Sequence, residues 1–205
     1  GTGRVSVTPD LAVLSLGVET QEKTVAEARN VAAIAMQGLI DALKAEGVED
    51  SDIQTQFFNI QPNYVWNDQE RKQELDGYRV TNTVTAKVRD LSTIGDVIDG
   101  AVEAGGDETR INSVRFQAED SSAAEAEARA LAMQQAVVHA QQLADAAGVA
   151  LAKPIFISES GSVPVTQTFT DDSFARLESA SVAPTPIQVG ELDITVTVQA
   201  VFGIS

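Results

Sequence analysis

Strict alternation of apolar and polar residues constrains this chain more than any other feature of its sequence. From Leu192 to Phe202 every second residue is apolar, and the segment from Tyr78 to Arg89 alternates in the same way apart from Asn82. Successive side chains of a strand point to opposite faces, so this period of two predicts half-buried strands. We therefore expect antiparallel sheet with one face on a core and one in water.

Three segments with a helical period are expected to cover the apolar face. The first follows a capping box, Thr24 to Glu27, and stops at Gly47; the second spans residues 92–104. The third opens with a second capping box, Ser122 to Glu125, and stops at Gly148. Its many alanines predict close packing on a sheet or another helix, because small side chains let backbones approach. Its expected apolar side is Met133, Ala136, Ala140, Leu143 and Ala147, and that of the first helix is Ala28, Ala32, Ala35, Leu39 and Leu43.

The remaining extended segments complete the predicted topology. They lie at residues 3–7, 11–20, 53–66, 110–118 and 151–158, with a polar connection over 67–76. The order is ββαββαβαββ, and its β-α-β-β-α-β part within residues 11–118 is a split βαβ arrangement. We predict an α+β fold: a mostly antiparallel sheet with three helices packed on it, in a single domain over 1–205. Residues 119–205 then supply a helix, two strands and a long loop at 161–190.

The charge balance excludes several kinds of partner. There are 30 Asp and Glu against 14 Lys and Arg, a net charge of −16, which disfavours nucleic acid and anionic lipid. The acidity indicates solubility, including in a salty environment, or alternatively a weak surface for divalent cations. No cysteine is present, so disulfides and thiolate chemistry are excluded. No segment approaches the ~20 apolar residues of a spanning helix, so no direct membrane insertion is expected.

Few residues suggest an active site. His139 is the only histidine and lies on the flank of the third helix, where a solvated or hydrogen-bonded role is favoured over catalysis. The segment from Gly1 to Gly3 resembles a phosphate loop only superficially, because it precedes a strand and no Gly-Lys-Ser/Thr follows. Gly161 lies between two serines without forming a nucleophile elbow. No catalytic residue, cofactor site or metal site is therefore predicted, and the chain is not expected to be an enzyme.

The many carboxylates allow a third hypothesis, a hydrolase, which is less favoured than the assembly protein and the binding module given below. Asp96 and Asp99 are one helical turn apart, so they are a candidate catalytic pair. A second group could bind calcium weakly, although it lacks the spacing of an EF-hand loop. Solvated charge is the favoured interpretation of both sets. The second group is Glu46, Glu49, Asp50 and Asp52.

Aromatic residues give the best candidates for an interaction surface. Phe58, Tyr64 and Trp66 are separated by even numbers of residues on an extended segment, so their side chains point to one face. They belong either to the core or to an exposed apolar ridge that meets another subunit, since aromatic residues are enriched at interfaces. Phe169 and Phe174, within the 161–190 loop, are a second candidate interface; a disordered loop is the alternative.

Short motifs along nearly the whole chain follow one order. The most characteristic run is GYRVTNTV at 77–84, preceded by DIQT at 52–55 and QPNY at 61–64 and followed by AAGV at 146–149. In this order they resemble the SIMPL-domain family, which includes bacterial periplasmic immunogenic proteins. Ala152 departs from the glycine that members often carry, which leaves only the local turn geometry open.

The resemblance implies an exported protein of the cell envelope. A signal segment is then expected to have been removed before Gly1, although residues added for expression would equally explain a start other than Met. It also implies homo-oligomers and a link to stress tolerance, and it supplies no catalytic residues. The leading hypothesis is a non-enzymatic, extracytoplasmic protein that self-assembles. The alternative is a periplasmic or surface binding module for a peptide, an envelope polymer or a small ligand, using the loop and the neighbouring sheet edge.

Overall fold

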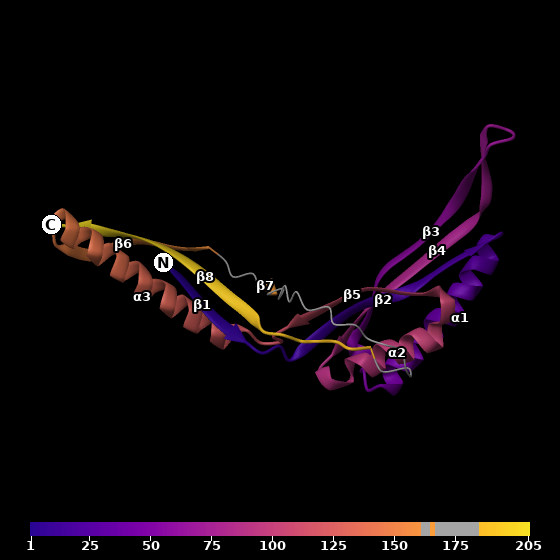
Figure 1. Cartoon of the computed structure of the whole chain (residues 1–205), viewed down its shortest axis with the longest axis horizontal. Coiled ribbons are helices and arrows are strands. Elements are labelled where there is room, and N and C mark those ends of the chain that lie inside the picture. Colours follow the sequence, from indigo (N-terminus) through magenta and orange to yellow (C-terminus); the bar gives the residue numbers. More distant parts are fainter. Residues whose placement is uncertain (161–164, 167–184) are drawn as a thin grey trace, which may run out of the picture. The chain divides into compact units, whose positions relative to one another are not determined.

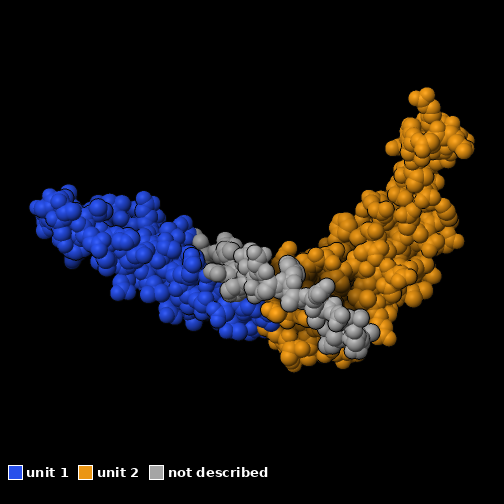
Figure 2. Space-filling model, viewed as in Figure 1, with its two compact units in different colours: residues 1–10, 117–176, 189–205 blue, residues 11–116, 177–188 orange. Residues whose placement is uncertain are grey.

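A computed structural model of the chain describes residues 1–160, 165–166 and 185–205 (Figure 1). The fold class is α+β and the elements follow the predicted order, so both predictions are confirmed. The chain divides into two compact units (Figure 2). Unit 1 comprises residues 1–10, 117–176 and 189–205, and unit 2 comprises residues 11–116 and 177–188.

Unit 2 is built on the predicted split βαβ arrangement. Its sheet has the order β3-β4-β2-β5, so one other strand separates the two strands of each β-α-β connection. Helices α1 and α2 pack beside each other, and α1 lies on β2 and β4. The elements are β2 (Leu11–Glu22), α1 (Val25–Ala45), β3 (Ile53–Asn67), β4 (Lys72–Val88), α2 (Ile94–Gly105) and β5 (Thr109–Gln117), with 3₁₀ turns at Asp50–Asp52, Leu91–Thr93 and Gly106–Glu108.

Helix α1 begins at the capping box that the sequence predicts. The Thr24 hydroxyl accepts a hydrogen bond from the Glu27 N–H at 3.2 Å and donates one to the Glu27 carboxylate at 2.7 Å. The helix ends where Gly47 adopts a φ of 87°, a value that favours glycine. The stripe between these ends contacts the sheet as expected, except that Met36 is buried and Ala35 only partly.

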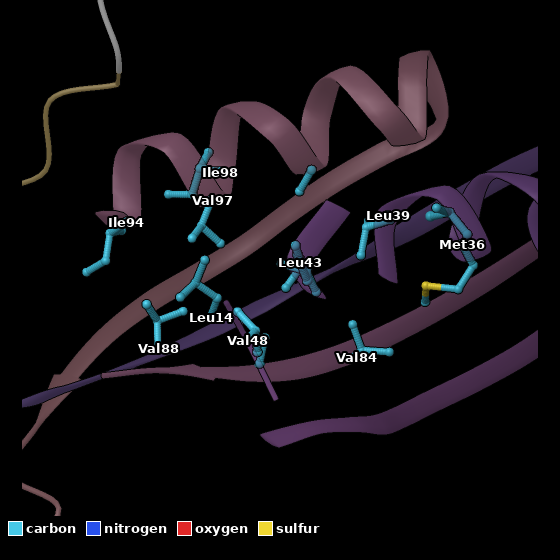
Figure 3. Close-up of a cluster of buried hydrophobic side chains, with 14 of the residues drawn as sticks. Leu14, Met36, Leu39, Leu43, Val48, Val84, Val88, Ile94, Val97 and Ile98 are labelled. Carbon is cyan, nitrogen blue, oxygen red and sulfur yellow. The ribbon is translucent and has the colours of Figure 1, made fainter. Parts of the chain in front are cut away.

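The core of unit 2 consists of large aliphatic side chains from both layers. Leu14 of β2 and Leu39 and Leu43 of α1 are fully buried, and α2 adds Val97 (Figure 3). The alternation of β4 is confirmed from Val80 to Val88, where buried residues occupy every second position except Asn82. Asn82 interrupts that row: it is half-buried, and its Oδ1 has no hydrogen-bond partner among the described residues.

Unit 1 contains a second sheet, where the sequence predicted a single one. Strand β1 (Thr2–Val7) pairs with β8 (Leu192–Ile204) from the far end of the chain, and β8 pairs with β6 (Leu151–Ser160). All of these pairs are antiparallel, as is that of β7 (Val165–Thr166) with β8. Thr2 lies opposite Thr197, and such long-range pairing leaves no local signal in the sequence.

Helix α3 (Ser122–Ala147) packs on this sheet through its smallest side chains. A Cβ on Gly3 would lie 1.9 Å from the carbonyl oxygen of Ala128, and one on Gly1 would lie 2.1 Å from that of Ala132. The predicted close packing of the alanine-rich helix is thus confirmed. Its predicted apolar side is wrong at Leu143, which is 72% exposed, and at Ala147, which is also exposed. The helix rests instead on a row of buried alanines, Ala128, Ala132, Ala136 and Ala144.

The start of α3 also differs from the prediction. Ser121, not Ser122, is the N-cap residue, and its hydroxyl bonds to the Glu125 carboxylate at 2.6 Å. The Ser122 N–H donates to Asp120 Oδ1 at 2.9 Å. The acidic residue therefore still closes the first turn, but the capping box at Ser122 is not formed.

Candidate functional site

The β3–β4 hairpin extends beyond the rest of its sheet. Strand β2 pairs with β4 only from Tyr78 to Val88, whereas β3 follows β4 to the pair Asn67–Lys72. Residues 63–67 and 72–77 therefore form a two-stranded projection, which we call the ribbon (Figures 1 and 2). The polar connection expected over 67–76 is largely strand, since the turn needs only residues 68–71.

Asn67 closes the end of the ribbon. Its side-chain oxygen accepts hydrogen bonds from the backbone N–H groups of Gln69 at 2.9 Å and Glu70 at 3.1 Å. Its amide donates to Glu74 at 2.9 Å, across the hairpin. An asparagine that bonds to the backbone two and three residues ahead stabilises a tight turn, which holds the ribbon together without a core.

A glycine and a bulge join the ribbon to the sheet. Gly77 has a φ of 141°, and a Cβ there would lie 2.3 Å from the carbonyl oxygen of Glu22. Next to it, Asn63 pairs with Gly77 but Tyr64 pairs with Leu75, so Asp76 is an extra residue in β4. Lys23 binds the Asp76 carboxylate at 2.8 Å and lowers its pKa below the usual range. The backbone at Gly77 and the ion pair of Lys23 with Asp76 thus hold the base of the ribbon against the sheet.

The three aromatic residues singled out from the sequence are exposed. Phe58, Tyr64 and Trp66 are 53%, 55% and 59% exposed, so they are not core residues. Ile60 lies at an even-numbered position of β3 like the three aromatic residues, and it packs partly against the core of unit 2. The three therefore point to the helix-covered side of the sheet. We call Phe58, Tyr64 and Trp66 the aromatic ridge. Its contact with another subunit stays a prediction, and Phe169 and Phe174 lie outside the described residues.

The sequence did not single out the other apolar residues around the ridge. Phe57 and Val65 are exposed on the opposite side of β3, and Leu75 is exposed across from Tyr64. Phe57 was missed because the extra residue Gln56 in β3 shifts the register there, a shift that no local pattern reveals. Leu75 was missed because it was assigned to a polar connection. Its neighbours Lys72 and Glu74, which bind each other at 3.4 Å, obscured a strand.

Three of the carboxylates singled out from the sequence bind other groups of the chain. Asp99 accepts hydrogen bonds from the Thr185 hydroxyl at 2.7 Å and the Thr185 N–H at 3.1 Å, so its carboxylate anchors a loop. At the end of α1, Asp50 binds Lys44 at 2.5 Å. Asp52 binds Arg89, whose guanidinium lowers the pKa of that carboxyl. These carboxylates are occupied by cationic or hydroxyl partners of the chain itself.

The other sequence candidates also lie apart from the ribbon. His139 is exposed on α3, beside a shallow depression formed with Ala140 and Leu143. Gly1 and Gly3 contact that helix and do not form a loop for phosphate. Within the described part of the chain, no group of three or more His, Cys, Asp and Glu residues is placed to hold a metal ion. No described helix is long and apolar enough to cross a membrane.

These features describe an α+β protein that displays exposed aromatic residues on a projecting β-ribbon. The chain belongs to the SIMPL family, described as "Protein of unknown function (DUF541)", which matches residues 1–202. The resemblance noted in the sequence is thereby confirmed. One family profile spans both compact units. That residues 1–205 form a single domain stays a prediction.

Several relatives are similar over much of the chain. The "26 kDa periplasmic immunogenic protein" of Brucella melitensis is 36% identical over 212 residues, which cover 100% of this chain and 82% of the relative. "Uncharacterized protein YggE" of Escherichia coli K12 is 32% identical over 145 residues, covering 71% of this chain and 57% of the relative. The YggE protein of Edwardsiella ictaluri is 30% identical, with shares of 74% and 62%. One relative is thus named as periplasmic, and the family carries no assigned activity.

Proposed function

We propose that this chain is a non-enzymatic, extracytoplasmic cell-envelope protein that self-assembles into homo-oligomers through the aromatic ridge. The observation that carries the proposal is the exposure of Phe58, Tyr64 and Trp66 by more than half of each side chain. Three large aromatic groups on one strand are costly to leave in water, and contiguous apolar patches of this kind mark interaction sites.

The surroundings of the ridge support a protein partner that is a second copy. All residues from Ile53 to Asn67 are uncharged, in a chain with a net charge of −16. Two copies repel each other through most of their surfaces, so association is least opposed along an uncharged strand. Tyr and Trp are also the residues that most often dominate the energy of an interface.

The test is the mass of the protein in solution, by light scattering after size exclusion. The double substitution Tyr64→Ser with Trp66→Ser is expected to weaken self-association by roughly tenfold or more, because it removes the aromatic anchors. Ile34→Ser is the matched control: Ile34 is 67% exposed on α1, away from the ridge. An oligomer mass that the double variant leaves unchanged contradicts the ridge as the interface.

The envelope location is part of the same proposal. A periplasmic relative with 36% identity supports it. Osmotic-shock fractionation of cells that express the full gene tests it, with retention of the protein in the cytoplasmic fraction as the contrary result. A role in stress tolerance, which the family resemblance implied, is tested by the survival under oxidant of a deletion strain complemented with the parent or the double variant.

A binding module remains the second candidate, because one edge of the unit 1 sheet is unusually apolar. Strand β6 is the outermost strand of the order β1-β8-β6, and Ile155, Phe156 and Ile157 on it are all more than half exposed. Such an edge could receive an extended peptide. A ligand that favours the native state raises its melting temperature, so screening peptides and envelope glycans for a thermal shift tests this alternative. No shift with any of them would count against it.

A further inference from the structure

The outer edge of β3 is open along an uncharged strand. In the order β3-β4-β2-β5, β3 is terminal, and no strand of the described residues pairs with its outer side. Edge strands are usually protected from pairing by charged side chains, especially lysine. From Ile53 to Asn67 this one carries no charge; its protection is limited to Pro62 and the bulge at Gln56. The edge is therefore available for a partner strand.

Pro62 reveals which backbone groups point outward. Antiparallel pairs alternate between pairs that exchange two hydrogen bonds and pairs that exchange none. Proline has no N–H, so the pair Pro62–Tyr78 belongs to the second kind, and Gln61 and Asn63 bond to β4. The backbone groups of Phe58, Ile60 and Pro62 then lie on the open edge, as does Tyr64 by continuation of the alternation.

The strand reads nearly the same in both directions. From Phe57 to Val65 its classes are apolar, apolar, amide, apolar, amide, apolar, amide, apolar, apolar. We infer that β3 pairs edge to edge with β3 of a second copy, antiparallel and about a two-fold axis at Gln61. This inference rests on the proposed self-assembly and names the mode of contact at the same strand.

That register matches residues on both faces of the paired strands. On the helix-covered face, Phe58 lies opposite Tyr64 of the second copy and Ile60 opposite its Pro62. On the other face, Phe57 lies opposite Val65, Asn59 opposite Asn63, and Gln61 opposite itself. Aromatic pairs and amide pairs at these spacings are favourable cross-strand contacts.

The neighbouring registers are poorer. The outward backbone N–H and C=O groups of the two strands face each other only if the two-fold axis passes through a residue. The two nearest alternative registers therefore centre on Ile60 or on Pro62. They bring Phe57 opposite Asn63 or Asn67, so an aromatic ring meets an amide. The register at Gln61 keeps apolar residues opposite apolar residues from Phe57 to Val65, and beyond that stretch Trp66 falls opposite Gln56, the extra residue of β3.

Proline also limits the strength of the contact. With Ile60 opposite Pro62 of the second copy, the two Ile60 carbonyl groups lack a donor at the centre of the pairing. The outer pairs, Phe58 with Tyr64, retain their backbone bonds. A two-fold contact occupies the open edge of both copies, so this pairing closes on itself rather than extending into a fibre.

A single cysteine tests the axis, because the chain has no other. Gln61 lies in a pair without mutual hydrogen bonds, where the Cα atoms are about 4.5 Å apart, within the range of a disulfide. Gln61→Cys is therefore expected to form a covalent dimer in oxidised glutathione. Asn59→Cys and Asn63→Cys serve as controls: each alone places its cysteines about four residues apart, roughly 13 Å, but the two variants mixed should cross-link.

The rate of dimer formation decides the outcome. We expect Gln61→Cys, and the mixture of Asn59→Cys with Asn63→Cys, to cross-link at least tenfold faster than either control variant alone. Equal rates in all four samples would overturn the edge pairing. If the cysteine-free protein is nevertheless oligomeric, self-assembly stands and only its mode is wrong. If the cysteine-free protein is monomeric and the rates are equal, both are wrong. If the cysteine-free protein is monomeric but Gln61→Cys and the mixture still cross-link faster than the controls, the strands pair weakly. That result supports the edge pairing and contradicts a stable assembly.

Discussion

The two units place helices on sheets by opposite means. In unit 1, α3 approaches β1 so closely that no side chain fits between them at Gly1 and Gly3. In unit 2, α1 is held away from its sheet by fully buried leucines such as Leu14 and Leu39. Dispersion and water exclusion stabilise both layers, but through backbone proximity in one and interlocking side chains in the other.

The two kinds of packing are sensitive to opposite kinds of substitution. An interior filled by large side chains loses stability when atoms are removed, because a cavity remains. A contact made by glycine and alanine loses stability when atoms are added, because the backbone must move. Substitutions in each unit test this contrast.

Leu14→Ala in unit 2 should lower the free energy of unfolding by about 3–4 kcal/mol. Leu14 is 0% exposed between the sheet and its helices, so its removal leaves a cavity as well as the lost transfer energy. Chemical denaturation measures the effect. Leu143→Ala, at a largely exposed site on α3, is the matched control and should have little effect. Equal losses in the two variants would contradict the assignment of the core.

Gly3→Ala in unit 1 should lower that free energy by about 1–3 kcal/mol, although it adds only one methyl group. The new Cβ would meet the Ala128 carbonyl oxygen at 1.9 Å, so α3 must move away from β1. Hydrogen exchange should accelerate in β1 and α3. The control is Gly203→Ala in β8, where the nearest atom is 3.4 Å away. A neutral Gly3→Ala would show that the two layers are not in close contact.

One ion pair in each unit should contribute less to the free energy of unfolding than either kind of packing does. Arg89 lowers the pKa of Asp52 in unit 2, and Arg129 lowers the pKa of Glu159 in unit 1. A lowered carboxyl pKa contributes stability above its unfolded value, which is lost as the pH falls through the folded value. Ion pairs near the surface contribute little to stability, so both effects are expected to be small.

The two pairs should differ, because the side chain of Asp52 is 10% exposed and that of Glu159 is 37% exposed. Asp52→Asn is therefore expected to reduce stability at pH 6 more than Glu159→Gln does. Both effects should shrink as the pH is lowered from 6 toward about 3, because protonation removes the charge that each arginine binds. Denaturation at both pH values measures the difference, and a Glu159→Gln effect that exceeds the Asp52→Asn effect would reverse the comparison.

The fold was predictable wherever the signal is local. The alternation of β4 and β8, the Thr24 cap and the glycines that end α1 and α3 each depend on residues close in sequence. The division into two sheets was not predictable, since it depends on β1 choosing β8 as its partner. The orientation of α3 was mispredicted for a related reason: alanines on several sides leave the helical period without a clear direction.

The candidate site was predictable in part. Parity alone placed Phe58, Tyr64 and Trp66 on one side of a strand, and the structure confirms that side. Their exposure depends on where the helices end relative to the hairpin, which is a property of the folded unit. The register shifts at Gln56 and Asp76 are likewise set by pairing with another strand.

The central claim is that this chain associates with itself along β3. The most direct test is the absolute mass of the unmodified protein by light scattering after size exclusion, at low and at moderate salt. We predict a stable multiple of 21.7 kDa, favoured by salt because salt screens the repulsion between copies with a net charge of −16. A mass of 21.7 kDa at micromolar concentration in both conditions would contradict the claim.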